Sequence, residues 1–144
     1  MILLNSEKLV ESAKEAREHA CSDISGFKVG AALLTKSGSI FLGCNIEDPS
    51  GIGVTNICAE RCAIIKALSE GHRDFEALAV VGGTDDLVSC TPCGVCRQYL
   101  NSFCRDITII CLENGEIREY TINELLPHSF SETFQHYPPT LPQG

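Results

Sequence analysis

The sequence predicts a layered α/β/α domain in which helices cover both faces of one mixed, five-stranded sheet. Apolar segments typical of strands alternate with segments of helical periodicity, and this alternation favours a layered α/β fold. The 144 residues contain no linker and no internal repeat. We therefore expect one domain over residues 1–144, with a loose tail from about residue 131, where prolines accumulate.

The first half of the chain has the pattern of a helix, two strands and a second helix. Asn5 or Ser6 provides an N-cap, and apolar residues follow at helical spacing as far as Ala20. The apolar segments 27–34 and 40–44 flank a Lys-Ser-Gly turn, which predicts a hairpin. Residues 48–57 have the composition of a loop. Residues 58–69 contain so few polar positions that we expect a largely buried helix.

The second half repeats the alternation. Residues 75–81 are continuously apolar, as in a strand that is covered on both faces. A loop at 84–92 leads to a helix at 94–104 and a strand at 107–112. Asn114-Gly115 is a strong hairpin turn into a last strand at 117–120. The segment Thr121-Ile122-Asn123-Glu124 has the form of a capping box for a short helix that stops near Pro127.

Charge and hydropathy exclude several classes of partner. The net charge is −8, and no block of Lys or Arg interrupts the acidic balance. Binding to nucleic acid depends on basic residues that neutralise phosphates, so we expect no nucleic-acid partner. No apolar run approaches the 18 or so residues that a membrane span needs, and residues 1–7 lack the basic start of a signal peptide. We expect a cytoplasmic protein that acts on a small molecule and not on a membrane.

The nine cysteines point to metal or redox chemistry. Nine is an odd number and no secretory signal accompanies them, so a disulfide framework is disfavoured. Four of the cysteines lie in apolar stretches, and we expect them to be buried packing residues: Cys21, Cys44, Cys104 and Cys111.

Three of the remaining cysteines lie where a loop enters a predicted helix. Cys58 opens the segment Cys-Ala-Glu-Arg, and Cys93 and Cys96 belong to the segment Pro-Cys-Gly-Val-Cys-Arg-Gln. A spacing of three puts Cys93 and Cys96 on one face of a helical turn. Helix N-termini carry partial positive charge that favours thiolates. If the two helix starts meet, the three sulfurs surround one Zn²⁺ ion.

Three protein ligands leave a fourth tetrahedral position for water, which is the catalytic arrangement of zinc. Glu60 is not needed as a ligand and is placed to act as a general acid and base. Three thiolates give the zinc site a formal charge of −1. We expect Arg61 and Arg97 to offset this charge by donating hydrogen bonds to the ligand sulfurs.

Two other classes of protein use similar cysteines. In a non-catalytic zinc module, Cys62 or Cys90 closes a four-sulfur site, which leaves Glu60 idle. In a thiol–disulfide oxidoreductase, Cys93 and Cys96 cycle without metal, which leaves the third cysteine unexplained. A Cys-x-x-Cys pair alone is a weak signal. Its combination with an upstream Cys-Ala-Glu is typical of zinc-dependent deaminases.

At these motifs the chain resembles the small cytidine deaminase family, over most of its length. The matching stretches are residues 27–34, Gly43-Cys44-Asn45-Ile46-Glu47, residues 58–64, residues 91–98 and Glu124-Leu125-Leu126-Pro127. The resemblance implies the cytidine deaminase fold, one Zn²⁺ per subunit, and a homotetramer with active sites near subunit interfaces. It also implies hydrolytic deamination of cytidine and 2′-deoxycytidine to the uridine forms and ammonia, in which water activated by zinc attacks C4.

The resemblance further implies roles in substrate binding. Asn45 and Glu47 match an Asn-x-Glu pair that binds the ribose 3′-hydroxyl, and Phe130 resembles a C-terminal Phe that reaches a neighbouring subunit's site. Without the resemblance, the Asn45–Glu47 pair is typical of the polar end of a strand. Phe130 would then simply cover a sheet edge.

Three further residues match positions around the base. Phe27 matches an aromatic that packs against the pyrimidine, although alone it is typical of a core strand. Ala59 matches a position whose backbone contacts the base. Thr91 stands where the family usually has a Ser whose carbonyl faces the departing amine.

Two departures from the family leave the substrate open. Residues 24–26 replace a Tyr-Ser element that often precedes the strand Phe. The 48–57 loop lacks the usual aromatic and is about two residues longer. A modified aminopyrimidine nucleoside, such as a nucleoside antibiotic, is therefore an alternative substrate.

Overall fold

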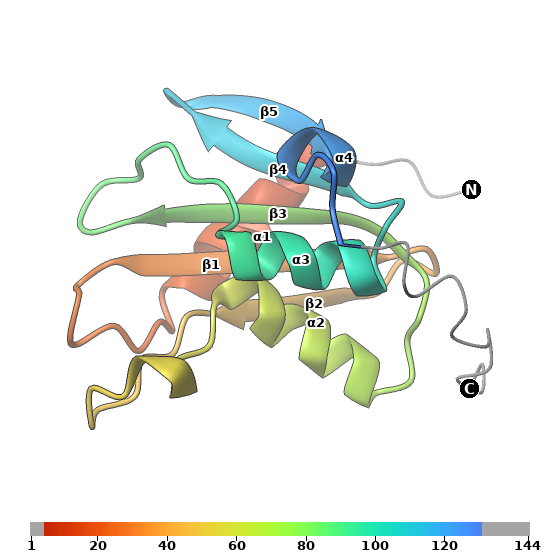
Figure 1. Ribbon diagram of the computed structural model, residues 1–144. Coiled ribbons are helices and arrows are strands. Elements are labelled where there is room, and N and C mark those ends of the chain that lie inside the picture. The colour runs from red at the N-terminus through yellow and green to blue at the C-terminus, as the bar shows by residue number, and fades with distance from the viewer. Residues whose placement is uncertain (1–4, 131–144) are drawn as a thin grey trace.

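The computed structural model describes residues 5–130 and contains one five-stranded sheet flanked by helices (Figure 1). The elements in chain order are α1 (Ser6–Arg17), β1 (Lys28–Thr35), β2 (Ile40–Cys44), the 3₁₀ turn η1 (Gly53–Thr55), α2 (Ala59–Ser69), β3 (Phe75–Gly83), α3 (Gly94–Phe103), β4 (Thr108–Glu113), β5 (Glu116–Thr121) and α4 (Ile122–Leu125). The tail predicted from about residue 131 lies outside the described residues. None of the helices within residues 5–130 is long and apolar enough to cross a membrane.

The sheet has the strand order β2-β1-β3-β4-β5. β3 and β4 run parallel and are connected through α3, whereas the other three neighbouring pairs are antiparallel. The two predicted hairpins are β1–β2 and β4–β5, which form the two ends of the sheet. The predicted mixed, five-stranded sheet is therefore confirmed.

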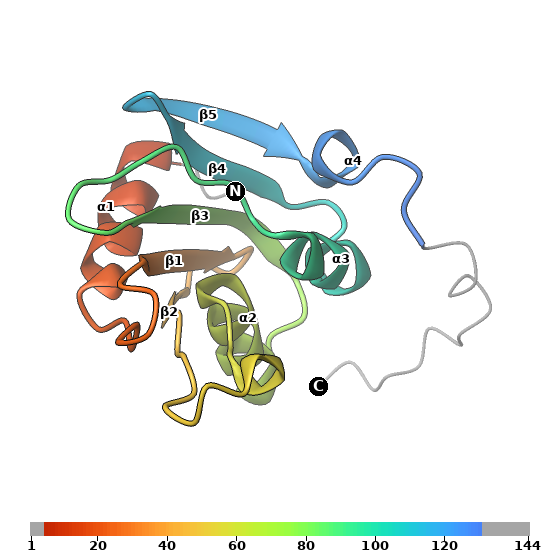
Figure 2. The same ribbon diagram turned by 60° about the vertical axis from the view of Figure 1, so that its left-hand side comes forward.

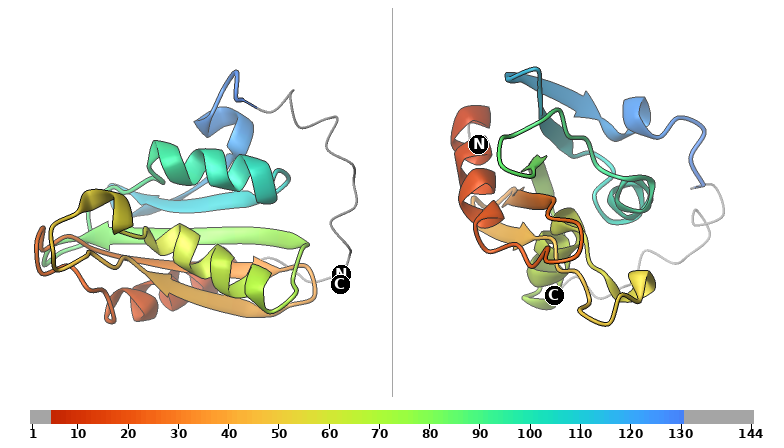
Figure 3. Two further views of the ribbon diagram at one scale, coloured as in Figure 1. Left: turned by 60° about the horizontal axis from the view of Figure 1, so that its bottom comes forward. Right: turned by 90° about the vertical axis from the view of Figure 1, so that its left-hand side faces the viewer.

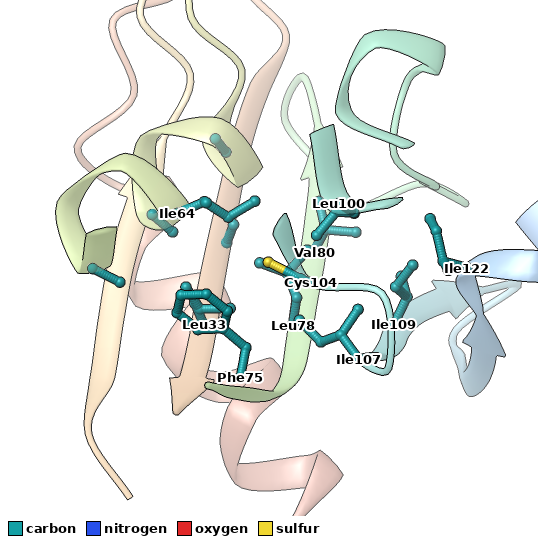
Figure 4. Close-up of a cluster of buried hydrophobic side chains, with 14 of the residues drawn as sticks. Leu33, Ile64, Phe75, Leu78, Val80, Leu100, Cys104, Ile107, Ile109 and Ile122 are labelled. Atoms are coloured by element: carbon teal, nitrogen blue, oxygen red, sulfur yellow. The ribbon is translucent and has the colours of Figure 1, made fainter. Parts of the chain in front are cut away.

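Helices cover the two faces of the sheet, as the views in Figures 2 and 3 show. Because strand side chains alternate between faces, each central strand contributes to two apolar clusters. Leu33, Leu78 and Ile109 face α2 and α3, and Figure 4 shows them packed with Ile64 and Leu100. On the opposite face, α1 covers a second cluster: Ala32, Leu34, Ala77, Ala79, Val81 and Ile110 pack against Leu9, Val10 and Ala13. The three-layer prediction is confirmed.

Local signals at the helix ends explain where several elements begin. The side chain of Asn5 accepts a hydrogen bond from the Lys8 backbone and caps α1. Thr121 and Glu124 form the predicted capping box of α4. The 48–57 segment is a loop, as predicted, but it also contains η1.

Two expectations about burial are wrong. Helix α2 buries one face only, and Ile65 on its other face is 42% exposed, because α2 packs over β1 and the edge strand β2 and no further layer of the described chain covers it. Among the four cysteines expected to be buried, Cys104 and Cys111 are buried and Cys44 is partly buried. Cys21 is exposed because it follows α1 and makes only an isolated bridge to Ile46.

Candidate active site

Helices α2 and α3 begin side by side at one edge of the layer that covers the sheet (Figures 1 and 3). Cys58 is the N-cap of α2 and Cys93 is the N-cap of α3. Neither sulfur caps a backbone N–H group of its own helix, so both sulfurs are available for a shared site. The partial positive charge of two helix N-termini favours negative charge at that site.

A glycine allows α2 to approach the sheet closely at this point. A Cβ atom added to Gly43 on β2 would lie 2.3 Å from the Ala59 carbonyl oxygen and 2.5 Å from the Ala63 nitrogen. Both distances are far below van der Waals contact, so only glycine permits this packing. The first turn of α2, which begins directly after Cys58, therefore lies against β2.

Three sulfurs come together at the two helix starts. The sulfur atoms of Cys58, Cys93 and Cys96 lie within 4.8 Å of one another, and residues 5–130 contain no second group of three or more potential metal ligands this close. The sulfurs of Cys58 and Cys93 are 3.7 Å apart. Zinc–sulfur bonds of about 2.3 Å in a tetrahedron place two sulfurs about 3.8 Å apart. The donor set therefore fits a tetrahedral zinc ion with one position left open.

Hydrogen bonds concentrate negative charge on Cys58. The contact with the Cys96 thiol, followed by that with Arg61, lowers the pKa of Cys58 to about 5, against the opposing effect of burial. The same contact with Cys58, together with burial and the nearby Glu60, raises the pKa of Cys96. These contacts favour the thiolate form of Cys58, which is the form that binds a metal ion.

Glu60 lies beside the sulfur cluster and is 4% exposed. Its Oε2 accepts a hydrogen bond of 3.2 Å from the Cys96 Sγ. Burial is the main cause that raises the pKa of Glu60, and the negative charge on Cys58 adds to it. A carboxyl group with a raised pKa next to a metal site is suited to accept a proton and then donate it.

The two arginines expected near the sulfurs behave differently. Arg61 Nη2 donates to Cys58 Sγ at 3.2 Å, and its buried Nε has no partner within the described residues. Arg97 donates to no ligand sulfur, unlike the expectation. Its guanidinium binds the Pro92 carbonyl at 2.7 Å, the Leu125 carbonyl at 2.7 Å and the Thr91 Oγ1 at 3.0 Å. Arg97 therefore holds the loop that delivers Cys93, because its side chain turns back toward that loop and α4.

A pocket of about 280 Å³ opens beside the sulfurs and Glu60. Of the expected substrate-binding residues, Phe27, Asn45, Ala59 and Thr91 line it, together with Cys58, Glu60 and Cys93. Its walls also include four residues with no predicted role in substrate binding: Val29, Asn56, Ile57 and Cys90. A partly apolar pocket of this size beside a reactive carboxyl is suited to a flat aromatic ring.

Asn45 lines the pocket whereas Glu47 does not, and the two side chains have different partners. Asn45 Oδ1 accepts from the Val29 backbone at 2.8 Å, and Asn45 Nδ2 donates to the Phe27 carbonyl at 2.8 Å. Asn45 thereby fixes the backbone on both sides of the Phe27–Val29 segment. Glu47 Oε1 accepts from the backbone and hydroxyl of Ser25, so a residue of the 24–26 segment orients this carboxylate.

The structure does not bring every candidate residue to the pocket. Phe130 is 65% exposed and does not line the pocket of its own chain; its carbonyl accepts from Gln98 Nε2. Cys62 faces a different hollow, and neither Cys62 nor Cys90 belongs to the three-sulfur group. This geometry favours an open metal site over a closed four-sulfur site. The geometry also argues against a redox motif of Cys93 and Cys96 alone, because such a motif would not require Cys58 beside them.

The unassigned pocket residues had different signals in the sequence. Cys90 lies three positions before Cys93, and burial raises its pKa to about 11, so it remains a neutral thiol at physiological pH. Ile57 and Asn56 precede Cys58 in a segment of loop composition, where no periodicity indicates which side chain faces inward. Only the pairing of Ile57 with Ile46 in the folded chain reveals their position.

Comparison with known proteins identifies the family. Residues 4–112 match the family model described as the cytidine and deoxycytidylate deaminase zinc-binding region. The chain is 49% identical to a cytidine deaminase of Sporosarcina psychrophila over 131 residues, which cover 90% of this chain and 93% of the relative. It is 48% identical to a cytidine deaminase of Halalkalibacterium halodurans over 130 residues, 89% of this chain and 96% of the relative. A crystal structure of cytidine deaminase from Burkholderia pseudomallei matches with a TM-score of 0.80 and 40% identity, over 88% of this chain and all of that one. The chain therefore belongs to the cytidine and deoxycytidylate deaminase family.

Proposed function

We propose that this chain is a zinc-dependent enzyme that hydrolyses cytidine and 2′-deoxycytidine to uridine and 2′-deoxyuridine with release of ammonia. The observation that carries the proposal is the group of three sulfurs beside a buried glutamate at the wall of one pocket. Family membership and the zinc-binding region support the same activity. The sequence similarity to the relatives extends over about nine-tenths of the chain.

Cys58, Cys93 and Cys96 would hold one zinc ion per subunit. When bound, zinc supplies Lewis acidity that activates a water molecule near neutral pH. Arg61 stabilises the thiolate of Cys58 through its hydrogen bond, and Arg97 keeps the Cys93 loop in place. The proton transfers of the reaction would then be carried out by Glu60.

Glu60 would move two protons during the reaction. It accepts a proton from the attacking water and gives it to the ring nitrogen next to C4. It then takes the second proton from the new hydroxyl on C4 and gives it to the amine, which leaves as ammonia. One water is consumed, the C4–N bond breaks and a C4–O bond forms, so the reaction balances without a redox partner. The buried position of Glu60 keeps bulk water away from this proton.

The pocket residues would orient the nucleoside. The ring of Phe27 packs against the pyrimidine, and the backbone of Ala59, at the first position of α2, binds a polar atom of the base. The carbonyl of Thr91 faces the departing amine. Asn45 and Glu47 bind the ribose, which favours an ordinary nucleoside over a modified one.

A paired kinetic and metal assay tests this function. We expect loss of cytidine absorbance with the wild-type protein, and a fall in turnover of about 10²–10⁴-fold for Glu60→Gln with zinc retained. Glu116→Gln is the matched control, because Glu116 is exposed in the β4–β5 hairpin. Full activity of Glu60→Gln would remove Glu60 from its role. Faster turnover of a nucleoside antibiotic than of cytidine would reassign the substrate.

The assembly and the cellular setting are also part of the proposal. Large apolar side chains are exposed between residues 46 and 54 and on α2: Ile46, Ile52, Val54 and Ile65. Exposed apolar surface favours contact with another subunit, and we propose a homotetramer in which Phe130 reaches a neighbouring site. Light scattering of the purified protein tests it, and a monomer at micromolar concentration would contradict it. Nine unpaired thiols fit a reducing cytoplasm.

A further inference from the structure

We infer that Asn56 binds the sugar of the substrate. Its amide donates a hydrogen bond to the oxygen of the 3′-hydroxyl, and Glu47 accepts the proton of the same hydroxyl. This inference rests on the proposed nucleoside deaminase function. It assigns a substrate role to the atypical 48–57 loop, whose last residues line the pocket.

Backbone pairing puts Asn56 next to Glu47. Ile46 and Ile57 exchange two backbone hydrogen bonds, of 2.9 and 3.0 Å, in an antiparallel bridge. The residues that flank such a bridge oppose each other, so Glu47 lies opposite Asn56 and Asn45 lies opposite Cys58. Side chains two positions apart share one face of an extended segment. All four therefore lie on one side, and three of them line the pocket: Asn45, Asn56 and Cys58.

The amide of Asn56 has a defined orientation. Asp48 N donates to Asn56 Oδ1 at 2.6 Å. A backbone N–H requires an acceptor, so this bond fixes which end of the amide carries the oxygen. The amide nitrogen, with two N–H donors, makes no hydrogen bond within residues 5–130.

The loop holds Asn56 in place before any ligand binds. The carboxylate of Asp48 accepts from the backbone of Ser50 at 2.8 Å and from the hydroxyl of Thr55. These bonds lower the pKa of Asp48, so the carboxylate stays ionised and keeps both contacts. A donor already held in position loses little entropy on binding.

A sugar hydroxyl needs both a proton acceptor and a proton donor in its site. Glu47 Oε1 is engaged by Ser25, whereas its Oε2 makes no hydrogen bond within the described residues. Oε2 can therefore accept the hydroxyl proton. Asn45 uses its oxygen on the Val29 N–H and one of its two amide N–H groups on the Phe27 carbonyl, so one N–H group of Asn45 remains for the sugar. The nitrogen of Asn56 keeps both of its N–H groups and is placed to give the hydroxyl oxygen a further donor.

The test replaces the donor while keeping the loop contact. Asn56→Asp retains an oxygen for Asp48 N but presents a carboxylate where the amide donor stood. Asn114→Asp adds the same charge in the β4–β5 turn and serves as the matched control. For cytidine at pH 8, we expect KM to rise roughly tenfold in Asn56→Asp, with kcat changed less than threefold.

Analogues that lack one hydroxyl separate a direct contact from general disruption. With 3′-deoxycytidine, which lacks the hydroxyl assigned to Glu47, wild type and Asn56→Asp should have KM values within threefold. With 2′- and 5′-deoxycytidine the tenfold difference should persist. Asn56→Ala should show the same selectivity if the Asp variant unfolds early.

Three results would overturn the inference. One is an equal loss on cytidine and on every analogue, another is no loss at all, and the third is coupling to the 2′- or 5′-hydroxyl. A wild-type protein that leaves cytidine unchanged would instead refute the proposed function, and the role of Asn56 would fall with it.

Discussion

Replacing Gly43 by alanine tests how β2 positions the metal site. The added Cβ would lie 2.3 Å from the Ala59 carbonyl oxygen, whereas ordinary contact begins at 3.4 Å. The first turn of α2 must therefore move by about 1 Å. The atoms that the new methyl group would meet belong to the α2 backbone, which cannot rotate away as a flexible side chain can. Overpacking of this kind costs about 1–3 kcal/mol of the free energy of unfolding.

The displacement should also weaken metal binding. Cys58 directly precedes Ala59, so a shift of the helix start moves one of the three sulfurs. We expect zinc affinity to fall about tenfold or more, as when the supports of metal ligands are removed. The melting temperature should fall by roughly 3–12 °C, since each kcal/mol is worth about 3–4 °C in a domain of this size.

Two measurements check this prediction: thermal unfolding of the zinc-free protein, and competition for zinc with a coloured chelator. Gly53→Ala is the matched control, because a Cβ at Gly53 meets nothing within 4 Å. If Gly43→Ala matched Gly53→Ala in both stability and zinc affinity, the close approach of β2 and α2 would not position the site.

The Cys93 loop, the cysteine thiols and the metal each give a testable expectation. Arg97→Lys should lower zinc affinity about tenfold, since one ammonium cannot replace three bonds around the Cys93 loop; unchanged affinity in the chelator assay would argue against this role. At pH 8, iodoacetamide should modify Cys21 in the folded protein well before Cys104 and Cys111, and peptide mass spectrometry showing the reverse order would contradict the described burial. Burial raises the pKa of the Cys104 and Cys111 thiols to about 12, so these thiols ionise more easily in the unfolded chain than in the folded one. Their contribution to the free energy of unfolding is therefore complete below pH 8.5 and is lost as pH rises from about 9 to 12. Urea unfolding across that range should show the decline, and a flat profile would contradict it. Chelation of zinc should remove about 2.7 kcal/mol of stability relative to protein with free zinc at 100 times its Kd, and calorimetry showing no shift would exclude a metal bound to the folded state.

The order of elements could be predicted because local signals and periodicity agree along most of the chain. The capping box at Thr121 and the turn at Asn114 each set one boundary from neighbouring residues alone. The exposed face of α2 could not be predicted in this way. Its apolar residues, such as Ile65, resemble those of a buried helix, and only the position of β2 at the sheet edge leaves that face uncovered.

The parts of the candidate site that depend on local sequence could also be predicted, whereas the parts that depend on distant contacts could not. The spacing of Cys58, Cys93 and Cys96 predicts three sulfurs at two helix starts, because a helix N-terminus is a local feature. The direction of the Arg97 side chain and the position of Asn56 both depend on contacts between distant segments. Because Arg97 is adjacent to Cys96, the sequence wrongly predicted a hydrogen bond to a ligand sulfur. For Asn56 the sequence contained no signal at all.

The most direct test of the account is zinc X-ray absorption of the purified protein. Three sulfur ligands at about 2.3 Å and one oxygen at about 2.0 Å are predicted, because only Cys58, Cys93 and Cys96 converge within the described chain. A shell of four sulfurs, or a protein that binds no zinc, would contradict the central claim that this site is open and catalytic.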